Sequence, residues 1–398
     1  MQKCGANLVC YYTRTEPAAE WPDGVKMVRW LCVLHLSLTV ALVPPVARLS
    51  RHVLCSGAAY DYCVQSLGCT AEEAAKAEGK LLPRSAESRT REKIDYVCNW
   101  LQSELGLSDA ELKKMVMRFP SVLGYNKASV EPKLDWLQKR LDLDVGQLRS
   151  ILLRMPPVLG SSVEDNLAPT LEWLQTRLDL DEPGLRKMVL RFPSLLSMSV
   201  EDNMAPKLDW LQRRLDLDDA QLKKIVVVSP SLLGYSSVDN MEPKLQWLQT
   251  RLDLDAVQLK KMIVTSPTLL SMTVVDKIEP NLDWLQTRLN LDAPELRKMV
   301  LFHPQLLGYS VEDNMQPKLG FLEEELGLSV SEVRASIVSA PNRLSYSLNK
   351  RYRARLEVCR AAGVDAKRVL SYATKSDELF CKHTGIDPEA LRAAQENV

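Results

Sequence analysis

The sequence has little of what catalytic or metal-binding chemistry requires. Only four histidines occur among 398 residues, and no two of them are near each other in sequence. The nine cysteines include no C-x2-C pair, which excludes the usual zinc-ribbon and redox spacings. Glycine-rich phosphate loops, dinucleotide fingerprints and nucleophile elbows are absent as well. We therefore predict a protein that is not an enzyme and that holds no cofactor and no metal.

An excess of charge of either sign is also absent. Lys plus Arg equal 51 and Asp plus Glu equal 51, so the formal net charge is zero. Because bulk attraction cannot then draw nucleic acid to the protein, any basic surface must be local. The 46% hydrophobic and 26% charged content is typical of a globular protein, and it excludes disorder as the main state.

One apolar run, residues 28–43, lies in the N-terminal segment and has basic residues at its start. The run is short for a membrane span and is typical of the hydrophobic part of a targeting leader. The basic stretch 44–60 contains no acidic residue, as in a transit peptide. We predict that residues 1–85 are a cleaved leader for plastid or mitochondrion followed by a poorly ordered segment. A membrane anchor is the alternative for the apolar run.

Internal repetition dominates the remainder of the chain. Tryptophan recurs at a spacing of 36 and then 37 residues: Trp100, Trp136, Trp173, Trp210, Trp247 and Trp284, with Phe321 next. One proline column keeps the same register: Pro120, Pro156, Pro193, Pro230, Pro267, Pro304 and Pro341. A second column does so too: Pro132, Pro169, Pro206, Pro243, Pro280 and Pro317. Three columns in one register predict about seven 37-residue units between Ile94 and Ser345.

Each unit is predicted to hold two helices and a short turn. In the unit from residue 199, apolar residues spaced 4, 3 and 4 apart lie on one face of a helix: Met204, Leu208, Leu211 and Leu215. Ser199 followed by Asp202 predicts a capped start for this helix. Pro206 either begins the main helix as its first residue or kinks a longer one, and the sequence leaves both open.

The second helix is marked by N-cap pairs three residues apart. They are Ser108/Glu111, Asp144/Gln147, Asp218/Gln221, Asp255/Gln258, Asp292/Glu295 and Ser329/Glu332, and only Asp181/Gly184 departs. A proline ends this helix and begins a short turn of 3₁₀ type.

No single unit can bury its own Leu and Trp residues, so neighbouring units must stack. The predicted fold is an all-α α-solenoid of about seven 37-residue helix–helix–3₁₀ repeats forming a curved superhelix, with the Leu and Trp columns in the core or in the packing between repeats. The repeats span residues 86–345, and residues 346–398 form a basic C-terminal half-repeat with capping helices.

Three segments carry a resemblance to a known family. They are FPSLLSMSVEDNMAPKLDWL, SPSLLGYSSVDNMEPKLQWL and HPQLLGYSVEDNMQPKLGFL. Each combines a helix-ending proline, a Pro-x-Leu-Leu turn and an Asn-x-x-Pro segment, and this pattern resembles the mitochondrial transcription termination factor (mTERF) family. The resemblance implies an α-solenoid with a groove for a nucleic-acid duplex. It also implies an organellar protein acting on transcription, RNA processing or ribosome assembly.

One position in the second helix is basic in all seven units: Lys113, Arg149, Arg186, Lys223, Lys260, Arg297 and Arg334. The next position is basic in five: Lys114, Lys187, Lys224, Lys261 and Lys298. The first column is the predicted phosphate-binding stripe, and joint charge reversal at Lys223, Lys260 and Arg297 is its test. The alternative is a solvated helix face with local pairs such as Asp109–Lys113 and Asp219–Lys223.

Two further basic groups are candidates. The arginines four residues after a Trp are predicted to stack on its indole: Arg140, Arg177, Arg214, Arg251 and Arg288. The terminal half-unit offers a second nucleic-acid contact through Lys350, Arg351, Arg353 and Arg355, or else it is a solubilising cap.

These features predict an organellar nucleic-acid-binding protein of mTERF type that regulates organelle gene expression. Its partner would be double-stranded DNA or organellar RNA, with protein partners in addition, and the mature protein would be a monomer away from the membrane. The repeats themselves are acidic, with 29 Lys or Arg against 35 Asp or Glu between Ile94 and Ser345. A helical-repeat scaffold that binds a basic protein without nucleic-acid contact is therefore the alternative function.

Overall fold

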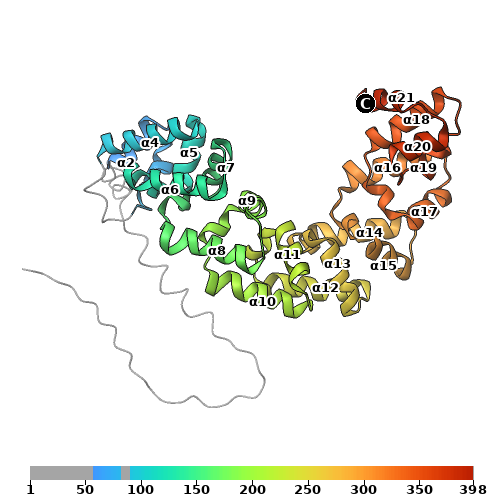
Figure 1. The fold of residues 1–398 in the computed structure, drawn as a ribbon, viewed down its shortest axis with the longest axis horizontal. Coiled ribbons are helices and arrows are strands. Elements are labelled where there is room, and N and C mark those ends of the chain that lie inside the picture. Colours follow the sequence, from blue (N-terminus) through green and yellow to red (C-terminus); the bar gives the residue numbers. More distant parts are fainter. Residues whose placement is uncertain (1–56, 82–89, 398) are drawn as a thin grey trace, which may run out of the picture. The chain divides into compact units, whose positions relative to one another are not determined.

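The computed structural model describes residues 57–81 and 90–397. Within these residues every regular element is helical and no strand occurs. The elements recur in the order long helix, shorter helix and 3₁₀ turn, and successive units follow one another along the chain (Figure 1). The predicted α-solenoid is confirmed.

Each unit begins with a longer helix, which we call helix A. In the first two units it is α4 (Arg91–Leu105) and α6 (Lys127–Leu141). In the later units a five-residue π turn leads directly into the α-helix. These pairs are Val163–Leu167 with α8 (Ala168–Arg177), Val200–Met204 with α10 (Ala205–Arg214), Ser237–Met241 with α12 (Glu242–Leu252), Val274–Ile278 with α14 (Glu279–Arg288), and Val311–Met315 with α16 (Gln316–Gly320). A second π turn, Phe321–Glu325, follows α16.

Helix B, the second helix, has ten residues in all seven units. The helices are α5 (Asp109–Arg118), α7 (Val145–Arg154), α9 (Glu182–Arg191), α11 (Asp219–Val228), α13 (Ala256–Thr265), α15 (Ala293–Phe302) and α17 (Val330–Ser339). The 3₁₀ turns that follow are Pro120–Gly124, Pro156–Gly160, Pro193–Ser197, Pro230–Gly234, Pro267–Ser271, Pro304–Gly308 and Pro341–Ser345. Each begins at the first proline column, because proline lacks the amide that would continue helix B.

The predicted N-caps of helix B are confirmed. All six pairs form reciprocal capping boxes, as where the Asp218 carboxylate accepts from the Gln221 amide at 2.7 Å. Asp181 still accepts from the amide of Gly184 at 2.9 Å, but glycine has no side chain to return the bond. Each box satisfies two amides that a helix start would otherwise leave free, so the start of helix B is fixed locally.

The second proline column lies inside helix A. Met204 and Ala205 both have helical backbone angles, and the amide of Met204 donates to the carbonyl of Ser199, five residues earlier, at 3.1 Å. This wider turn leaves room for the ring of Pro206, which would otherwise meet the carbonyl of the preceding turn. Of the two alternatives, the longer helix is the one observed. Its start is capped as predicted, with the Ser199 hydroxyl accepting from the Asp202 amide at 3.0 Å.

The joint between helix A and helix B contains a residue in the left-handed conformation. These residues recur at spacings of 36 to 38: Gly68, Gly106, Asp142, Asp179, Asp216, Asp253, Asn290, Gly327 and Gly363. Glycine, aspartate and asparagine are the residue types that tolerate this conformation. The column continues beyond the seven units at both ends, so the flanking helices follow the same plan.

The N-terminal flank is a helix pair, α2 (Ala58–Gln65) and α3 (Ala71–Glu78), which packs against the first unit. The prediction of a poorly ordered segment up to residue 85 is therefore wrong for residues 57–81. The apolar run and the predicted leader fall in residues 1–56, outside the described residues. In the described part of the chain, no helix combines the length and apolar character needed to cross a membrane.

At the C-terminal end, a π turn, Leu348–Arg353, leads into four helices. They are α18 (Ala354–Ala361), α19 (Lys367–Ser371), α20 (Asp377–Thr384) and α21 (Pro388–Glu396). The helices α18 and α21 pack against each other, and their buried residues belong to the same hydrophobic core as the repeats.

Leucines of helices A and B form one continuous core through the described units. Helix A contacts helix B of its own unit and, as α4 with α7 or α6 with α9, helix B of the next. The Trp residues of the repeats pack against this core but stay half-buried. Both columns thus pack as predicted, with the Leu residues inside the core and the Trp residues packed against its edge.

A polar column crosses the core. Lys207 and Lys318 in helix A donate to the 3₁₀-turn carbonyls of Leu233 and Leu344 at 2.7 and 2.6 Å, and Lys244 donates likewise to Leu270. Asn281 takes this place in its own unit. Burial lowers the pKa of Lys244 and Lys318 to about 8.

We expect Lys244→Met to lower the free energy of unfolding by about 1–3 kcal/mol, because a buried carbonyl loses its donor. The difference in the free energy of unfolding between wild type and this variant should widen as pH rises from about 8 to 10. In that window the unfolded chain binds more protons at Lys244 than the folded chain, so wild-type stability gains. The exchange variant Asn240→Lys/Lys244→Asn reproduces the Lys277/Asn281 arrangement of the next unit and should retain most of the stability. Denaturant titration compares the three proteins, and equal losses in both variants would contradict this role.

Candidate nucleic-acid interface

Each of the seven residues of the predicted phosphate-binding stripe contacts the preceding helix pair, which is the N-terminal flank for Lys113 and the preceding unit for the other six. Their partners lie close to the joint between helices A and B of that unit. Arg149 donates to the carboxylate of Glu111 at 2.5 Å. The other six donate to backbone carbonyls: Lys113 to Gly68 at 2.9 Å, Arg186 to Asp142 at 2.8 Å, Lys223 to Asp179, Lys260 to Asp216, Arg297 to Asp253 at 2.9 Å and Arg334 to Leu289 at 3.0 Å. We call these seven residues the clasp column.

The clasp column has a clear structural role. The end of helix A carries carbonyls without helical partners and a partial negative charge, and a cation there compensates both. The predicted local ion pairs are wrong: Asp109 accepts from Gln102 at 2.8 Å and Asp219 from Gln212 at 3.0 Å, while Lys113 and Lys223 reach back across the interface between units. Phosphate binding by the clasp column stays a prediction, and its cations would have to leave or share these partners.

The arginine column four residues after each Trp reaches forward instead. Its members contact the next unit: Arg140 to Gln175 at 2.6 Å, Arg177 to Gln212 at 2.7 Å, Arg214 to Glu242 at 2.8 Å, Arg251 to Asp283 at 2.8 Å and Arg288 to Glu323 at 2.7 Å. Among the described residues the cation–ring contacts involve other side chains, so the predicted stacking on the indoles is wrong. These arginines instead form charge-assisted bonds between units.

The C-terminal basic cluster divides into different environments. Arg355 is fully buried, with the Asp377 carboxylate at 2.6 Å and the ring of Phe380 beneath it, so its prediction as a nucleic-acid contact is wrong. It occupies the register position of Lys318, which explains its burial. Arg351 donates to the carbonyl of Lys375 at 2.5 Å, and Arg353 pairs with Glu325 at 3.1 Å. Lys350 is exposed, and its ammonium has no partner among the described residues.

The position after the clasp column presents cations of a different kind. Lys114, Lys187, Lys224, Lys261 and Lys298 are all exposed, and none of their ammonium groups has a partner in the described part of the chain. We call these five the ridge lysines. The column is visible in sequence, but spacing within a helix does not distinguish its free cations from the engaged cations one position earlier.

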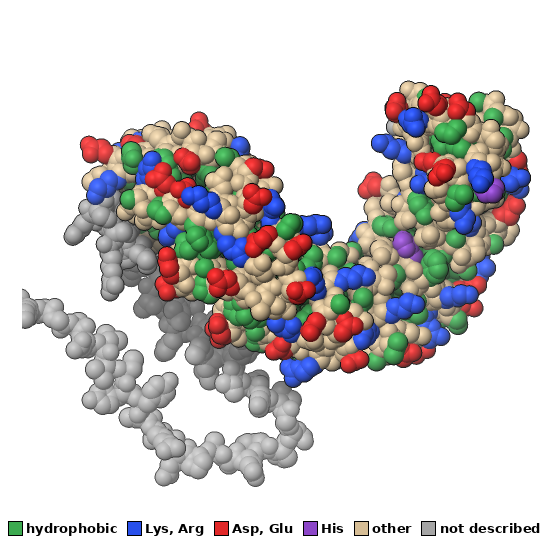
Figure 2. All heavy atoms as spheres, viewed as in Figure 1, with side chains coloured by type: hydrophobic (Ala, Val, Ile, Leu, Met, Phe, Trp, Pro, Cys, Tyr) green, Lys and Arg blue, Asp and Glu red, His purple; other side chains and the backbone are tan. Residues whose placement is uncertain are grey.

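The helix positions four residues from the ridge lysines carry no acid. Four residues earlier stand Ala110, Pro183, Ala220, Val257 and Pro294, and four residues later stand Arg118, Arg191, Val228, Thr265 and Phe302. Residues four apart are adjacent on a helix surface, so each lysine has only neutral or basic neighbours along its own row. Glu111 and Glu295 lie three residues before two of the lysines, but both carboxylates are paired with arginines of the next unit. On the face shown in Figure 2, blue and red side chains are interspersed, so an attractive surface on this protein must be narrow.

Unpaired acidic residues gather elsewhere, at the start of helix A. They are Glu164, Asp165, Glu201, Asp202, Asp239, Asp276, Glu312 and Asp313, all exposed and none within ion-pair distance of a described Lys or Arg. Exposed acids without a basic partner among the described residues thus stand at the start of helix A, and N-cap aspartates of helix B such as Asp218 and Asp255 are further examples.

Side chains of the types that bind metals do not cluster in the described residues. No three His, Cys, Asp or Glu side chains there could hold a metal ion. Burial lowers the pKa of His303, whose ring nitrogen lies 3.2 Å from the Tyr309 hydroxyl. The absence of enzymatic activity, cofactor and metal remains a prediction.

Comparison with protein-family models decides the family. The mTERF model matches residues 80–145, 137–237 and 211–381, which together span roughly three quarters of the chain. The chain belongs to the mTERF family. This membership suggests an organellar nucleic-acid-binding regulator of gene expression. No curated protein matches the chain.

The mTERF matches cover the seven units and most of the C-terminal helices. The ridge lysines and the clasp column both lie inside the matched residues.

Proposed function

We propose that this mTERF protein binds nucleic acid along the ridge lysines and thereby regulates organelle gene expression. The observation that carries the proposal is the row of exposed ammonium groups without partners on B helices of the described units. Each unit of the solenoid repeats the same geometry, so a column in sequence becomes a line on the surface. Regularly placed cations along a line suit a phosphate backbone.

Electrostatics favour the ridge lysines over the clasp column. A cation that already contacts a carbonyl or a carboxylate must give up part of that interaction to bind phosphate. The ridge lysines lose only water and counterions, and the release of counterions from nucleic acid drives binding. The zero net charge of the chain does not oppose this, because screening limits the acids at the start of helix A to short range.

A salt titration with duplex DNA, single-stranded RNA and a folded RNA tests the function. If each ridge lysine meets one phosphate, log affinity should fall against log salt with a slope of about −4.5 for duplex DNA and about −3.5 for a single strand. The ligand with the steepest slope and the highest affinity identifies the target class. Failure of all three to bind at low salt would refute the proposal.

The location of the protein in the cell is part of the same proposal. A cleaved leader within residues 1–85 would deliver it to plastid or mitochondrion, and it would act there as a monomer away from the membrane. Import assays with the full chain, followed by N-terminal sequencing of the processed protein, check this.

A further inference from the structure

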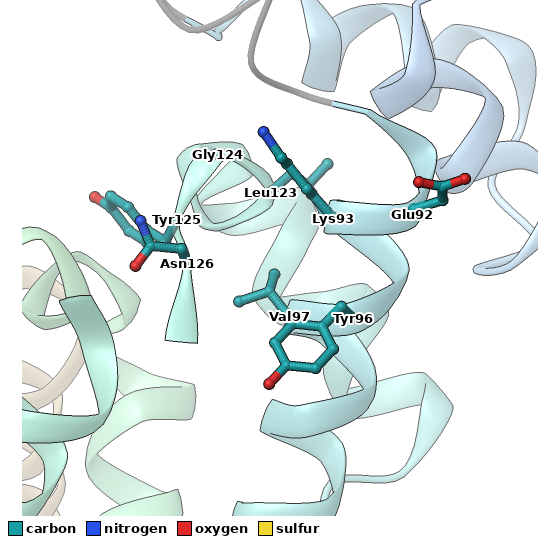
Figure 3. A pocket seen from close by; sticks show the side chains of 8 residues that line it. All are labelled: Glu92, Lys93, Tyr96, Val97, Leu123, Gly124, Tyr125 and Asn126. Atoms are coloured by element: carbon teal, nitrogen blue, oxygen red, sulfur yellow. The ribbon is translucent and has the colours of Figure 1, made fainter. Parts of the chain in front are cut away.

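A shallow hollow recurs between the start of helix A in one unit and the start of helix A in the next. Figure 3 shows the first, about 340 Å³ in volume, with Lys93 and Tyr96 on α4 and with Tyr125 and Asn126 after the 3₁₀ turn. Two hollows in the same register are acidic. One holds about 380 Å³ beside Asp165 and Glu201, and the other about 500 Å³ beside Asp239 and Asp276. We call them the 165–201 hollow and the 239–276 hollow.

The four carboxylates of these two hollows are exposed and have no basic partner among the described residues. No Lys or Arg of the described chain lines the 165–201 hollow. Lys244 lines the 239–276 hollow, but it is only 6% exposed, and its ammonium is held by the Leu270 carbonyl and the Asn240 side chain. Both hollows therefore present negative charge to solvent.

Half of the residues that line the 239–276 hollow are apolar or aromatic. The half-buried indole of Trp247 lines it, together with Pro243 and Met272. Such a wall accepts the aliphatic stem of a lysine or arginine, and the indole face attracts the cation at its end.

The first unit shows how an ammonium group sits at such a wall. The Lys127 ammonium lies 5.6 Å from the ring centroid of Trp100 and 3.3 Å from the Glu131 carboxylate. Lys127 directly follows the N-cap of its helix A, and the residues in that position at the acidic hollows are Val200 and Val274. At these two positions the chain supplies no cation. The Lys244 ammonium, 5.9 Å from the ring centroid of Tyr235, lies in the 239–276 hollow, but the four carboxylates have no basic partner among the described residues.

We propose that the 165–201 and 239–276 hollows bind lysine or arginine side chains from an extended basic segment of a partner protein. Phosphate groups would be repelled by the four carboxylates, so this surface is separate from the ridge lysines and does not depend on the proposed nucleic-acid binding. The protein would then hold nucleic acid along helix B and a basic protein at the start of helix A.

Binding of a fluorescently labelled decalysine peptide to the full chain at low salt tests the proposal by anisotropy. The double variant Val200→Lys/Val274→Lys places the chain's own ammonium groups in both hollows, and we expect it to weaken peptide binding at least tenfold. The double variant Glu201→Gln/Asp276→Asn changes only exposed side chains and should weaken it at least threefold. Binding of an oligonucleotide should survive in the second variant.

The matched control is Val145→Lys/Val257→Lys, which adds the same charge at exposed valines on helix B. Peptide binding within twofold of wild type in this control supports the hollows. Equal weakening in the control would show a general charge effect and overturn the proposal. Wild-type binding in both hollow variants, absence of peptide binding to the wild-type chain, or loss of oligonucleotide binding in Glu201→Gln/Asp276→Asn would each overturn it too.

Discussion

Charge reversal at three ridge lysines, Lys187→Glu, Lys224→Glu and Lys261→Glu, is expected to weaken nucleic-acid binding by at least about 100-fold at low salt. Three favourable phosphate contacts become three repulsive ones, and the slope of log affinity against log salt should become less steep by about 2.7 for duplex DNA. These side chains are exposed and have no partner among the described residues, so the free energy of unfolding should change by less than about 0.5 kcal/mol for each. Fluorescence anisotropy and denaturant titration measure the two effects.

The clasp column provides the matched comparison. Lys223→Glu, Lys260→Glu and Arg297→Glu carry the same change of charge one position away, but each removes a cation from the end of helix A in the preceding unit. We expect a loss of about 1–2 kcal/mol of stability for each substitution. If the clasp variant instead kept its stability and lost binding while the ridge variant bound normally, the predicted stripe would be the interface and the ridge would not.

Substitution of the buried arginine, Arg355→Met, is expected to lower the free energy of unfolding by about 3–5 kcal/mol, more than any of the other single substitutions. Arg355 lies beneath the surface between α18 and α20, and its guanidinium donates to Asp377 and to the carbonyls of Tyr372 and Lys375. Its removal leaves the Asp377 carboxylate and two carbonyls without this donor. Hydrogen exchange should show that α19 to α21 open first, while the N-terminal units remain protected.

Arg353→Ala is the control for Arg355, because Arg353 is nearly half-exposed and pairs with Glu325 at the surface. A surface ion pair contributes at most about 1 kcal/mol, so this variant should unfold almost as wild type does. Similar stabilities for the Arg353 and Arg355 variants would contradict the structural role of the buried cation. The pH dependence of the free energy of unfolding is a second test. Burial would raise the pKa of Asp377, but hydrogen bonds from Arg355 and Gln395 outweigh burial and lower the pKa. The ionised Asp377 carboxylate therefore stabilises the folded protein above about pH 4, and this contribution to the free energy of unfolding is lost below that pH.

Local chemistry explains why much of the repeat could be predicted. A capping box needs only residues three apart, and all six predicted boxes are formed. Proline ends helix B by its own covalent structure. The left-handed joint follows the same logic, since Gly, Asp and Asn mark it at every unit, although the sequence pattern alone did not single it out.

Contacts between units could not be predicted in the same way. Helical spacing offers Lys223 a partner in Asp219, four residues away, but its actual partner Asp179 lies 44 residues earlier. The arginines after each Trp likewise reach a residue about 35 positions later rather than the adjacent indole. Both errors have one cause: the distance between helices of neighbouring units decides the partner, and spacing within a helix does not report it.

Sequence alone was sufficient for the family, the 37-residue period, the caps and the Leu core, because each depends on residues close together in the chain or on simple recurrence. Which cations are free is settled only by the packing of the units. That packing buries Arg355, engages the clasp column at helix ends of the preceding unit and leaves the ridge lysines without partners among the described residues. A charged side chain is available to a ligand only when no other part of the protein binds it. The stacking of neighbouring units decides which side chains are bound in this way.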